Sequence, residues 1–321
     1  MKKIFINNLL IILIFFFIFE IFLRSFDLAD LRGHGEELLK KQKNTETTVF
    51  GKKVFLDEYG YRVPYKNFLY NDSSDKIVFI GDSVLFGSGV NEEETFVGKL
   101  RKSKREISFI NASIIGNDVS DILNDIKKNN ILFNAKSFFI ILTLDDISIS
   151  GEKVENTKEN NSTNKSFFEK LKNNYFLSKI NLFLRSRSYT YIWIKGIFTK
   201  PSERYFFESF NYYKEKNKIN FFKDNILKIY EASRVNNFKI NFFILPYEYQ
   251  VRNNCSDEFL LPQNKIVEIF DKENIEYTNL TQYFCTHDNP VKLYLNFDPV
   301  HLSIKGHDLV FHKINELLNK N

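Results

Sequence analysis

The segment Ile77-Val78-Phe79-Ile80-Gly81-Asp82-Ser83-Val84-Leu85-Phe86-Gly87 joins an apolar run to a turn that contains glycine at both ends. An unbroken run of branched and aromatic residues is typical of a strand in a parallel sheet that is buried on both faces. This strand ends abruptly at Gly81-Asp82-Ser83, which predicts a serine hydroxyl at the carboxyl end of the sheet, where α/β folds place their sites. The alternative is that this serine has a structural role alone, as the N-cap of the helix that follows.

A second segment, Asp298-Pro299-Val300-His301-Leu302-Ser303, lies close to the end of the chain and favours the catalytic role of the serine. Serine alone is a poor nucleophile at neutral pH. It needs a histidine to take its proton and a carboxylate to orient that histidine. Asp298 and His301 can supply both, although an Asp-Pro-x-His stretch can also be a plain turn into a helix. The other histidines have no Asp three residues ahead of them; they are His34, His287, His307 and His312. His307 also lies inside a predicted helix.

The two segments together resemble the SGNH (GDSL-type) hydrolase family, over roughly residues 75–321. In that family a Gly-Asp-Ser motif follows the first strand, and an Asp-x-x-His motif near the C-terminus supplies acid and base. Val84 departs from the leucine that is usual after the serine. The resemblance implies a three-layer α/β/α, flavodoxin-like fold with a parallel sheet. It also implies hydrolysis of an ester through an acyl-enzyme on Ser83, without a metal or an organic cofactor.

The resemblance further implies an oxyanion hole, and here the sequence departs from the family. The expected donors are the backbone N–H of Ser83, a glycine after the second strand and an asparagine after the third. Gly116 fits the second role, but Asp145 stands where the asparagine is expected. An ionised carboxylate cannot donate a hydrogen bond, so Asp145 could serve only if burial beside Asp146 kept it protonated. Asn117 is an alternative donor.

Strand and helix patterns alternate along the chain, which predicts a parallel sheet covered by helices on both faces. The predicted strands span residues 76–80, 107–111, 137–144, 240–245 and 275–280. The predicted helices span residues 92–103, 119–130, 221–233, 265–273 and 304–319.

The N-terminal region predicts a membrane segment at residues 1–26, a stalk and lead-in at 27–75, and the hydrolase domain at 76–321. Residues 4–23 form an apolar run of about 20 residues, long enough to cross a bilayer as a helix. Lys2 and Lys3 precede it, which favours a cytoplasmic N-terminus. The alternative is a cleaved signal peptide, but no small-x-small cleavage site follows the run. We therefore expect an uncleaved anchor and a catalytic domain in the periplasm or at the cell surface.

Residues 150–220 interrupt the alternation as an aromatic-rich insertion. A polar run at 156–164 reads as a loop, and apolar and aromatic residues with interspersed Lys and Arg follow it. Two interpretations stay open. One is a lid or membrane-facing cap for an acyl or lipid-linked substrate. The other, slightly favoured, is a helical insertion packed on the core.

Composition narrows the class of protein. The chain has 321 residues, of which 43% are hydrophobic and 26% charged, so a sizeable core can form. The net charge of +5 is spread along the chain, so a nucleic-acid partner is not expected. Cys255 and Cys285 can form one disulfide or remain two buried thiols, and the disulfide is favoured outside the cytoplasm. A metal site is not expected, because too few ligands lie nearby.

Three functions remain compatible with these residues. The favoured one is a serine esterase that acts on an acetyl or acyl ester, carried by a glycan or a lipid-linked substrate. The second is O-acyl transfer to an envelope glycan, with a sugar hydroxyl in place of water. The third is a catalytically weak scaffold or glycan-binding protein, which Asp145 would favour.

Overall fold

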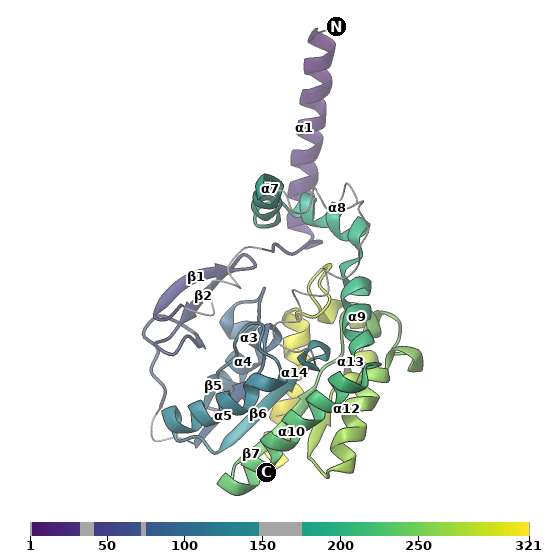
Figure 1. Cartoon of the computed structure of the whole chain (residues 1–321). Helices are drawn as coiled ribbons and strands as arrows, with labels where there is room; N and C mark the ends of the chain where they lie inside the picture. Colours follow the sequence, from purple (N-terminus) through teal and green to yellow (C-terminus); the bar gives the residue numbers. More distant parts are fainter. Residues whose placement is uncertain (1, 33–41, 72–74, 148–174, 321) are drawn as a thin grey trace.

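The computed structural model describes residues 2–32, 42–71, 75–147 and 175–320 (Figure 1). It begins with the long apolar helix α1 (Lys2–Ser25), which extends away from the rest of the chain. A small antiparallel sheet follows, built from β1 (Thr45–Val49), β2 (Lys52–Leu56) and β3 (Arg62–Val63). The remaining described residues form an α/β domain with the insertion helices between it and α1.

The α/β domain is built on a parallel sheet of five strands, which confirms the predicted fold. In chain order the strands are β4 (Asp75–Ile80), β5 (Ile107–Asn111), β6 (Ser137–Leu142), β7 (Lys239–Ile244) and β8 (Tyr277–Asn279). Their order across the sheet is β5-β4-β6-β7-β8. This is the flavodoxin-like doubly wound order, in which the chain changes direction between β4 and β6. A crevice opens at the carboxyl ends of strands at such a point, and Ser83 directly follows β4.

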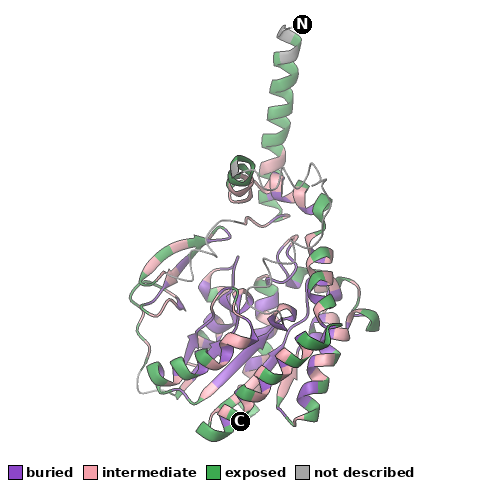
Figure 2. Cartoon of the chain, viewed as in Figure 1, coloured by how far each residue is buried: buried purple, intermediate pink, exposed green. Residues whose placement is uncertain are grey.

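Helices cover both faces of this sheet (Figure 1). Helix α4 (Phe96–Ser103) packs with α14 (Ile304–Lys320), and α5 (Val119–Phe133) packs with α10 (Lys216–Asn236). Helix α12 (Leu261–Lys272) connects β7 to β8. The central strands are almost fully buried between these layers (Figure 2), as their unbroken apolar runs predict.

The boundaries differ from the predicted ones where side chains terminate an element. The predicted helix 92–103 is a 3₁₀ turn, η1 (Glu92–Glu94), followed by α4. The break occurs because the Thr95 hydroxyl accepts a hydrogen bond from the backbone N–H of Gly98 and thereby caps α4. The predicted strand 137–144 ends at Leu142, because the chain turns into η2 (Leu144–Ile147).

In the part of the insertion that the structure describes, from residue 175 onward, three helices with different surroundings precede α10: α7 (Tyr175–Arg185), α8 (Tyr189–Thr199) and α9 (Pro201–Tyr212). Helix α9 packs on the domain core through buried Phe206 and Phe210. Helices α7 and α8 instead pack against each other, with α8 also against α1 (Figure 1). The packing of α9 agrees with a helical insertion on the core, and the lid or membrane-facing cap stays a prediction for α7 and α8. The polar run 156–164 lies outside the described residues.

Short helices and turns complete the domain on its carboxyl-terminal side. They are α11 (Glu248–Arg252), η4 (Asp257–Phe259), α13 (Thr281–Cys285) and η5 (Pro290–Leu293). Cys255 and Cys285 form a disulfide that connects the segment after α11 to the end of α13. The favoured prediction for these cysteines is thus met.

Candidate active site

Ser83 begins α3 (Ser83–Phe86), a single helical turn at the end of β4. The Asp82 carboxylate caps this turn by accepting a hydrogen bond from the backbone N–H of Val84 at 2.9 Å. The turn closes at Gly87, whose φ of 80° lies in the left-handed region that favours glycine. Ser83 is half-buried, so its hydroxyl is held in place and remains reachable.

Arg62 stabilises this turn through hydrogen bonds, a role that we did not predict from the sequence. Its guanidinium is fully buried and donates to the carbonyl oxygens of Phe86, Gly87 and Val90 at 2.6–2.7 Å. The carbonyl oxygens of Phe86 and Gly87 lie at the end of α3, so these hydrogen bonds help to fix the turn that Ser83 begins. The segment before the first strand of the domain, which could have been an ordinary exposed loop, therefore helps to position the serine.

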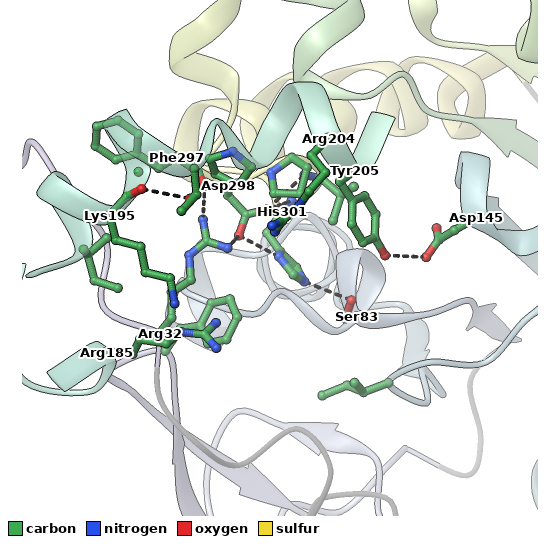
Figure 3. Close-up of a pocket in the computed structure, with 18 of the residues that line it drawn as sticks. Arg32, Ser83, Asp145, Arg185, Lys195, Arg204, Tyr205, Phe297, Asp298 and His301 are labelled. Atoms are coloured by element: carbon green, nitrogen blue, oxygen red, sulfur yellow. Dashed lines mark hydrogen bonds and ion pairs between the residues drawn. The ribbon is translucent and has the colours of Figure 1, made fainter. Parts of the chain in front are cut away.

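The structure brings Ser83, His301 and Asp298 into one relay (Figure 3). His301 Nε2 lies 2.9 Å from Ser83 Oγ, and His301 Nδ1 lies 2.9 Å from Asp298 Oδ2. The other carboxylate oxygen, Asp298 Oδ1, accepts backbone N–H groups of Val300 and His301 at 2.9 and 2.8 Å. These contacts fix the carboxylate, and the Phe50 ring meets the imidazole edge-on at 5.2 Å between centroids. The imidazole is therefore oriented to accept the serine proton.

A fourth side chain, Arg32, contacts the relay from the segment that follows α1. Its Nη1 lies 2.8 Å from Asp298 Oδ2, and its Nη2 donates to the carbonyl oxygen of Phe297 at 2.5 Å. Burial alone raises the pKa of Asp298, but the charges of Arg32 and His301 outweigh it and hold that pKa well below its usual range. Arg32 therefore keeps the relay carboxylate ionised.

Nothing in the sequence distinguished Arg32 from the other basic residues of the predicted stalk. It is remote from Asp298 along the chain, and only the fold brings the two together. A short motif such as Asp-x-x-His can reveal partners that are neighbours in sequence, but it carries no signal for a contact of this kind.

Gly116 and Asp145, the two other residues assigned to the oxyanion hole, line the same cavity as Ser83. Gly116 follows β5 and has a φ of 75°. Asp145 accepts hydrogen bonds from three hydroxyl groups: Tyr247 at 2.6 Å, Thr143 at 2.8 Å and Tyr205 at 2.9 Å. Its charge, followed by burial, raises the pKa of Tyr205 well above the usual value. The Asp145 carboxylate thus acts as an acceptor in these contacts.

The alternative candidates from the sequence lie elsewhere. The Asn117 amide donates to Asp125 at 2.7 Å, and Asn117 is not among the described residues that line the cavity. His307 is fully buried beside Phe96, where burial lowers its pKa to about 3. It therefore has a structural place in the core. His287 and His312 do not line the cavity either, and His34 falls outside the described residues.

The relay opens into a cavity of about 400 Å³ between the carboxyl ends of the strands and the insertion. Ile192 and Gly196 of α8 form part of its wall, and Tyr205 of α9 forms another part. The insertion thus shapes the site although α7 and α8 lie outside the domain core. Among the described residues, no three His, Cys, Asp or Glu side chains gather in a way that could hold a metal ion.

Comparison with known proteins returns structural matches only, since no family model and no curated protein matches this chain. A member of the lipolytic protein G-D-S-L family from Veillonella parvula is 12% identical, with a TM-score of 0.44 over 77% of this chain and 100% of its own. An acetylxylan esterase from Geobacillus stearothermophilus is 14% identical, with a TM-score of 0.42 over 77% and 94%. A psychrotrophic esterase from Pseudoalteromonas sp. is 13% identical, with a TM-score of 0.41 over 77% and 100%.

Proposed function

We propose that this chain is a serine ester hydrolase of the SGNH type that forms an acyl-enzyme on Ser83. The observation that carries the proposal is the continuous relay from Ser83 Oγ through both His301 nitrogens to Asp298, with each step at 2.9 Å. Two hydrogen bonds of this length, in this order, are what activation of a serine hydroxyl requires. The relay also lines a cavity in which a substrate can bind.

In the proposed reaction, His301 takes the Ser83 proton while Ser83 Oγ attacks the ester carbonyl. The tetrahedral intermediate collapses as His301 gives that proton to the departing alcohol oxygen, which leaves an acyl group on Ser83. Water then attacks the acyl-enzyme with His301 again as the base, and His301 returns that proton to Ser83 Oγ as the free acid departs. Asp298 remains ionised throughout and stabilises the imidazolium.

The proposed oxyanion donors are the backbone N–H groups of Ser83 and Gly116. Both residues line the cavity, and both are assigned to this role by the family resemblance. Asp145 is proposed to be structural, because its oxygens already accept the hydroxyls of Thr143, Tyr205 and Tyr247. In this proposal the carboxylate is held in the hydroxyl cluster and takes no part in binding the oxyanion.

We further propose that α1 is retained as a membrane anchor, with the domain outside the cytoplasm. Ile6–Ser25 is long and apolar enough to span a membrane, and two lysines precede it. The Glu20 carboxylate accepts the backbone N–H groups of Tyr189 and Thr190 at 2.9 and 2.8 Å, so it caps the start of α8. Cleavage after α1 would remove this cap. Helices α7 and α8 also expose apolar side chains beside α1, namely Phe176, Leu177, Ile180, Phe183, Ile194, Ile197 and Phe198.

The test of the reaction is turnover of 4-nitrophenyl acetate by the full chain in a non-ionic detergent. Ser83→Ala and His301→Ala should each lower kcat by about 10³-fold or more, because members of a relay act as a unit. Ser103→Ala removes an exposed hydroxyl on α4 and should match the wild type. Turnover by Ser83→Ala close to that of the wild type would refute the proposal. Adding a soluble glycan as acceptor, and measuring acetylated glycan against free acetate, separates acyl transfer from hydrolysis.

A further inference from the structure

The wall of the catalytic cavity carries more positive than negative charge. Among the described residues, its basic side chains come from four separate segments and its acidic ones from three. The basic residues are Arg32, Arg185, Lys195 and Arg204, and the acidic ones are Asp82, Asp145 and Asp298. Figure 3 shows Arg32, Arg185 and Lys195 grouped on one side of the cavity and Asp145 on the other, beside Tyr205. The excess of basic side chains is therefore concentrated on one side of the cavity.

Each cavity carboxylate already has partners of its own. Asp82 accepts the backbone N–H of Val84, and Asp145 accepts three hydroxyls. Asp298 pairs with His301 and with Arg32. The three acidic groups are thus committed to the serine turn, to the hydroxyl cluster and to the relay.

Lys195 and Arg204 have no carboxylate within ion-pair distance among the described residues. Lys195 is half-buried, and its Nζ donates to the Asn181 side-chain oxygen at 2.8 Å, which offers no compensating charge. Burial, together with the positive charges of Arg185, Arg204 and Arg32, lowers the pKa of Lys195. Placing a lysine in this position costs folding free energy, and a bound anion would offset that cost.

We propose that this cationic wall, defined by Lys195 and Arg204, binds an anionic group of the ester substrate. The inference rests on the proposed function, because it names the class of ester that enters the same cavity. Phosphate and carboxylate are the groups that such a wall recognises. The anion can belong to a water-soluble ester or to the headgroup of a membrane lipid. The second source is accessible because Lys195 lies on α8, which packs against α1.

The first experiment compares two acetate esters that differ in one charge, 4-acetoxybenzoate and 4-acetoxybenzamide. Each kcat/KM is divided by the rate of hydroxide-catalysed hydrolysis of the same ester, which removes the difference in intrinsic reactivity. We expect the anionic ester to be favoured by about tenfold or more at low salt, a difference of about 1.4 kcal/mol or more. The preference should shrink as salt is added, because ions screen partly exposed charges.

Two variants and a control assign this preference to the wall. Lys195→Gln and Arg204→Gln should each lower the ratio of the two kcat/KM values several-fold, whereas Lys195→Arg should retain it. Lys127→Gln makes the same change in net charge at an exposed position on α5, which does not line the cavity, and should leave the ratio unchanged. A wild-type ratio near one that does not vary with salt would overturn the proposal while leaving ester hydrolysis intact.

A binding measurement separates this proposal from the proposed function. Ser83→Ala cannot form an acyl-enzyme, so calorimetry with 4-acetamidobenzoate and 4-acetamidobenzamide reports affinity alone. Tighter binding of the anion, lost in the Ser83→Ala/Lys195→Gln double variant, supports the wall even if no ester is turned over. Equal affinities for the two compounds would contradict it even if esters are hydrolysed.

The two sources of the anion are distinguished with vesicles of phosphatidylcholine that contain either lysophosphatidylglycerol or lysophosphatidylcholine. Faster release of fatty acid from the anionic lysolipid, reduced by Lys195→Gln, assigns the wall to a lipid headgroup. A preference limited to the soluble acetate pair assigns it to a soluble ester. An absence of charge preference in both pairs overturns the inference.

Discussion

Four groups contact the Asp298 carboxylate and hold it in place in the site. Two backbone N–H groups, the His301 imidazole and the Arg32 guanidinium surround its carboxylate. The Asp-x-x-His spacing predicted the imidazole contact, because the two residues are neighbours in sequence. It could not predict Arg32, whose approach depends on how the segment after α1 folds back over the domain.

Replacing Arg32 with Gln tests whether this contact positions the relay. The guanidinium is one of the groups that hold the Asp298 pKa below its usual range, so its loss should raise that pKa. A carboxylate with a depressed pKa contributes stability above about pH 4, and this contribution is lost as the pH falls through the folded-state value. In Arg32→Gln that loss should occur at higher pH, so the pH profile of the free energy of unfolding should begin its acidic decline at a higher pH.

We also expect kcat to fall by about tenfold or more in Arg32→Gln, because the Asp298 carboxylate and the carbonyl of Phe297 lose a shared partner. KM for a neutral acetate should change much less. Arg105→Gln, at an exposed surface position, should reproduce the wild-type profile. An Arg32→Gln profile that superimposes on the wild type would show that Arg32 has no part in positioning the relay.

The second prediction at the scale of a single residue concerns Asp145. Asn in this position keeps one oxygen acceptor for three hydroxyl donors, and Tyr247 is almost fully buried. Asp145→Asn should therefore lower the free energy of unfolding by about 1–3 kcal/mol, as measured in urea. Asp224→Asn, on the exposed face of α10, should be neutral. Unchanged stability together with higher activity would instead identify Asp145 as a protonated oxyanion donor.

At the scale of elements, the sequence predicted the strands and helices of the sheet domain but not the arrangement of the insertion. The runs that form β4 and β6 are apolar throughout because both faces of these strands are covered. The aromatic residues of α7 and α8 did not predict where these helices pack. Their helical faces are apolar, but the partner of α8 is α1, and periodicity does not identify a partner.

The contact between α1 and α8 gives the prediction at this scale. Glu20→Ala removes the carboxylate that caps α8, and losing an N-cap typically costs about 0.5–2 kcal/mol of helix stability. Arg185 ends α7 and Arg187 lies in the short segment that joins α7 to α8, so trypsin should cut after these residues faster in this variant. Because α8 forms part of the cavity wall, kcat/KM should fall as well.

The control for this experiment is Glu93→Ala, which removes an exposed carboxylate from η1. It should leave both the tryptic cleavage rate and kcat/KM at their wild-type values. A Glu20→Ala variant with the cleavage pattern of the wild type would mean that α8 does not depend on α1.

At the scale of the whole molecule, residues 27–32, which follow α1, connect the apolar helix to the loop that carries Asp298. Asp30 accepts the backbone N–H of Asn296 at 2.7 Å, and the Asn296 amide donates to the carbonyl oxygen of Asp27 at 2.8 Å. Arg32 completes this set of contacts. From the sequence we predicted a stalk here, since the composition is charged and mixed. Composition alone does not reveal tertiary contacts such as these. Residues 27–32 of the predicted stalk contact the loop that carries Asp298.

The relay that this arrangement produces can be tested directly with a fluorophosphonate probe, which reacts only with an activated serine. The full chain in detergent is treated with the probe, and the modified peptide is identified by mass spectrometry. We predict one phosphonylated residue, Ser83, with labelling abolished in Ser83→Ala and strongly slowed in His301→Ala. Labelling of another serine, or equal labelling of the wild type and Ser83→Ala, would contradict the assignment of Ser83 as the nucleophile.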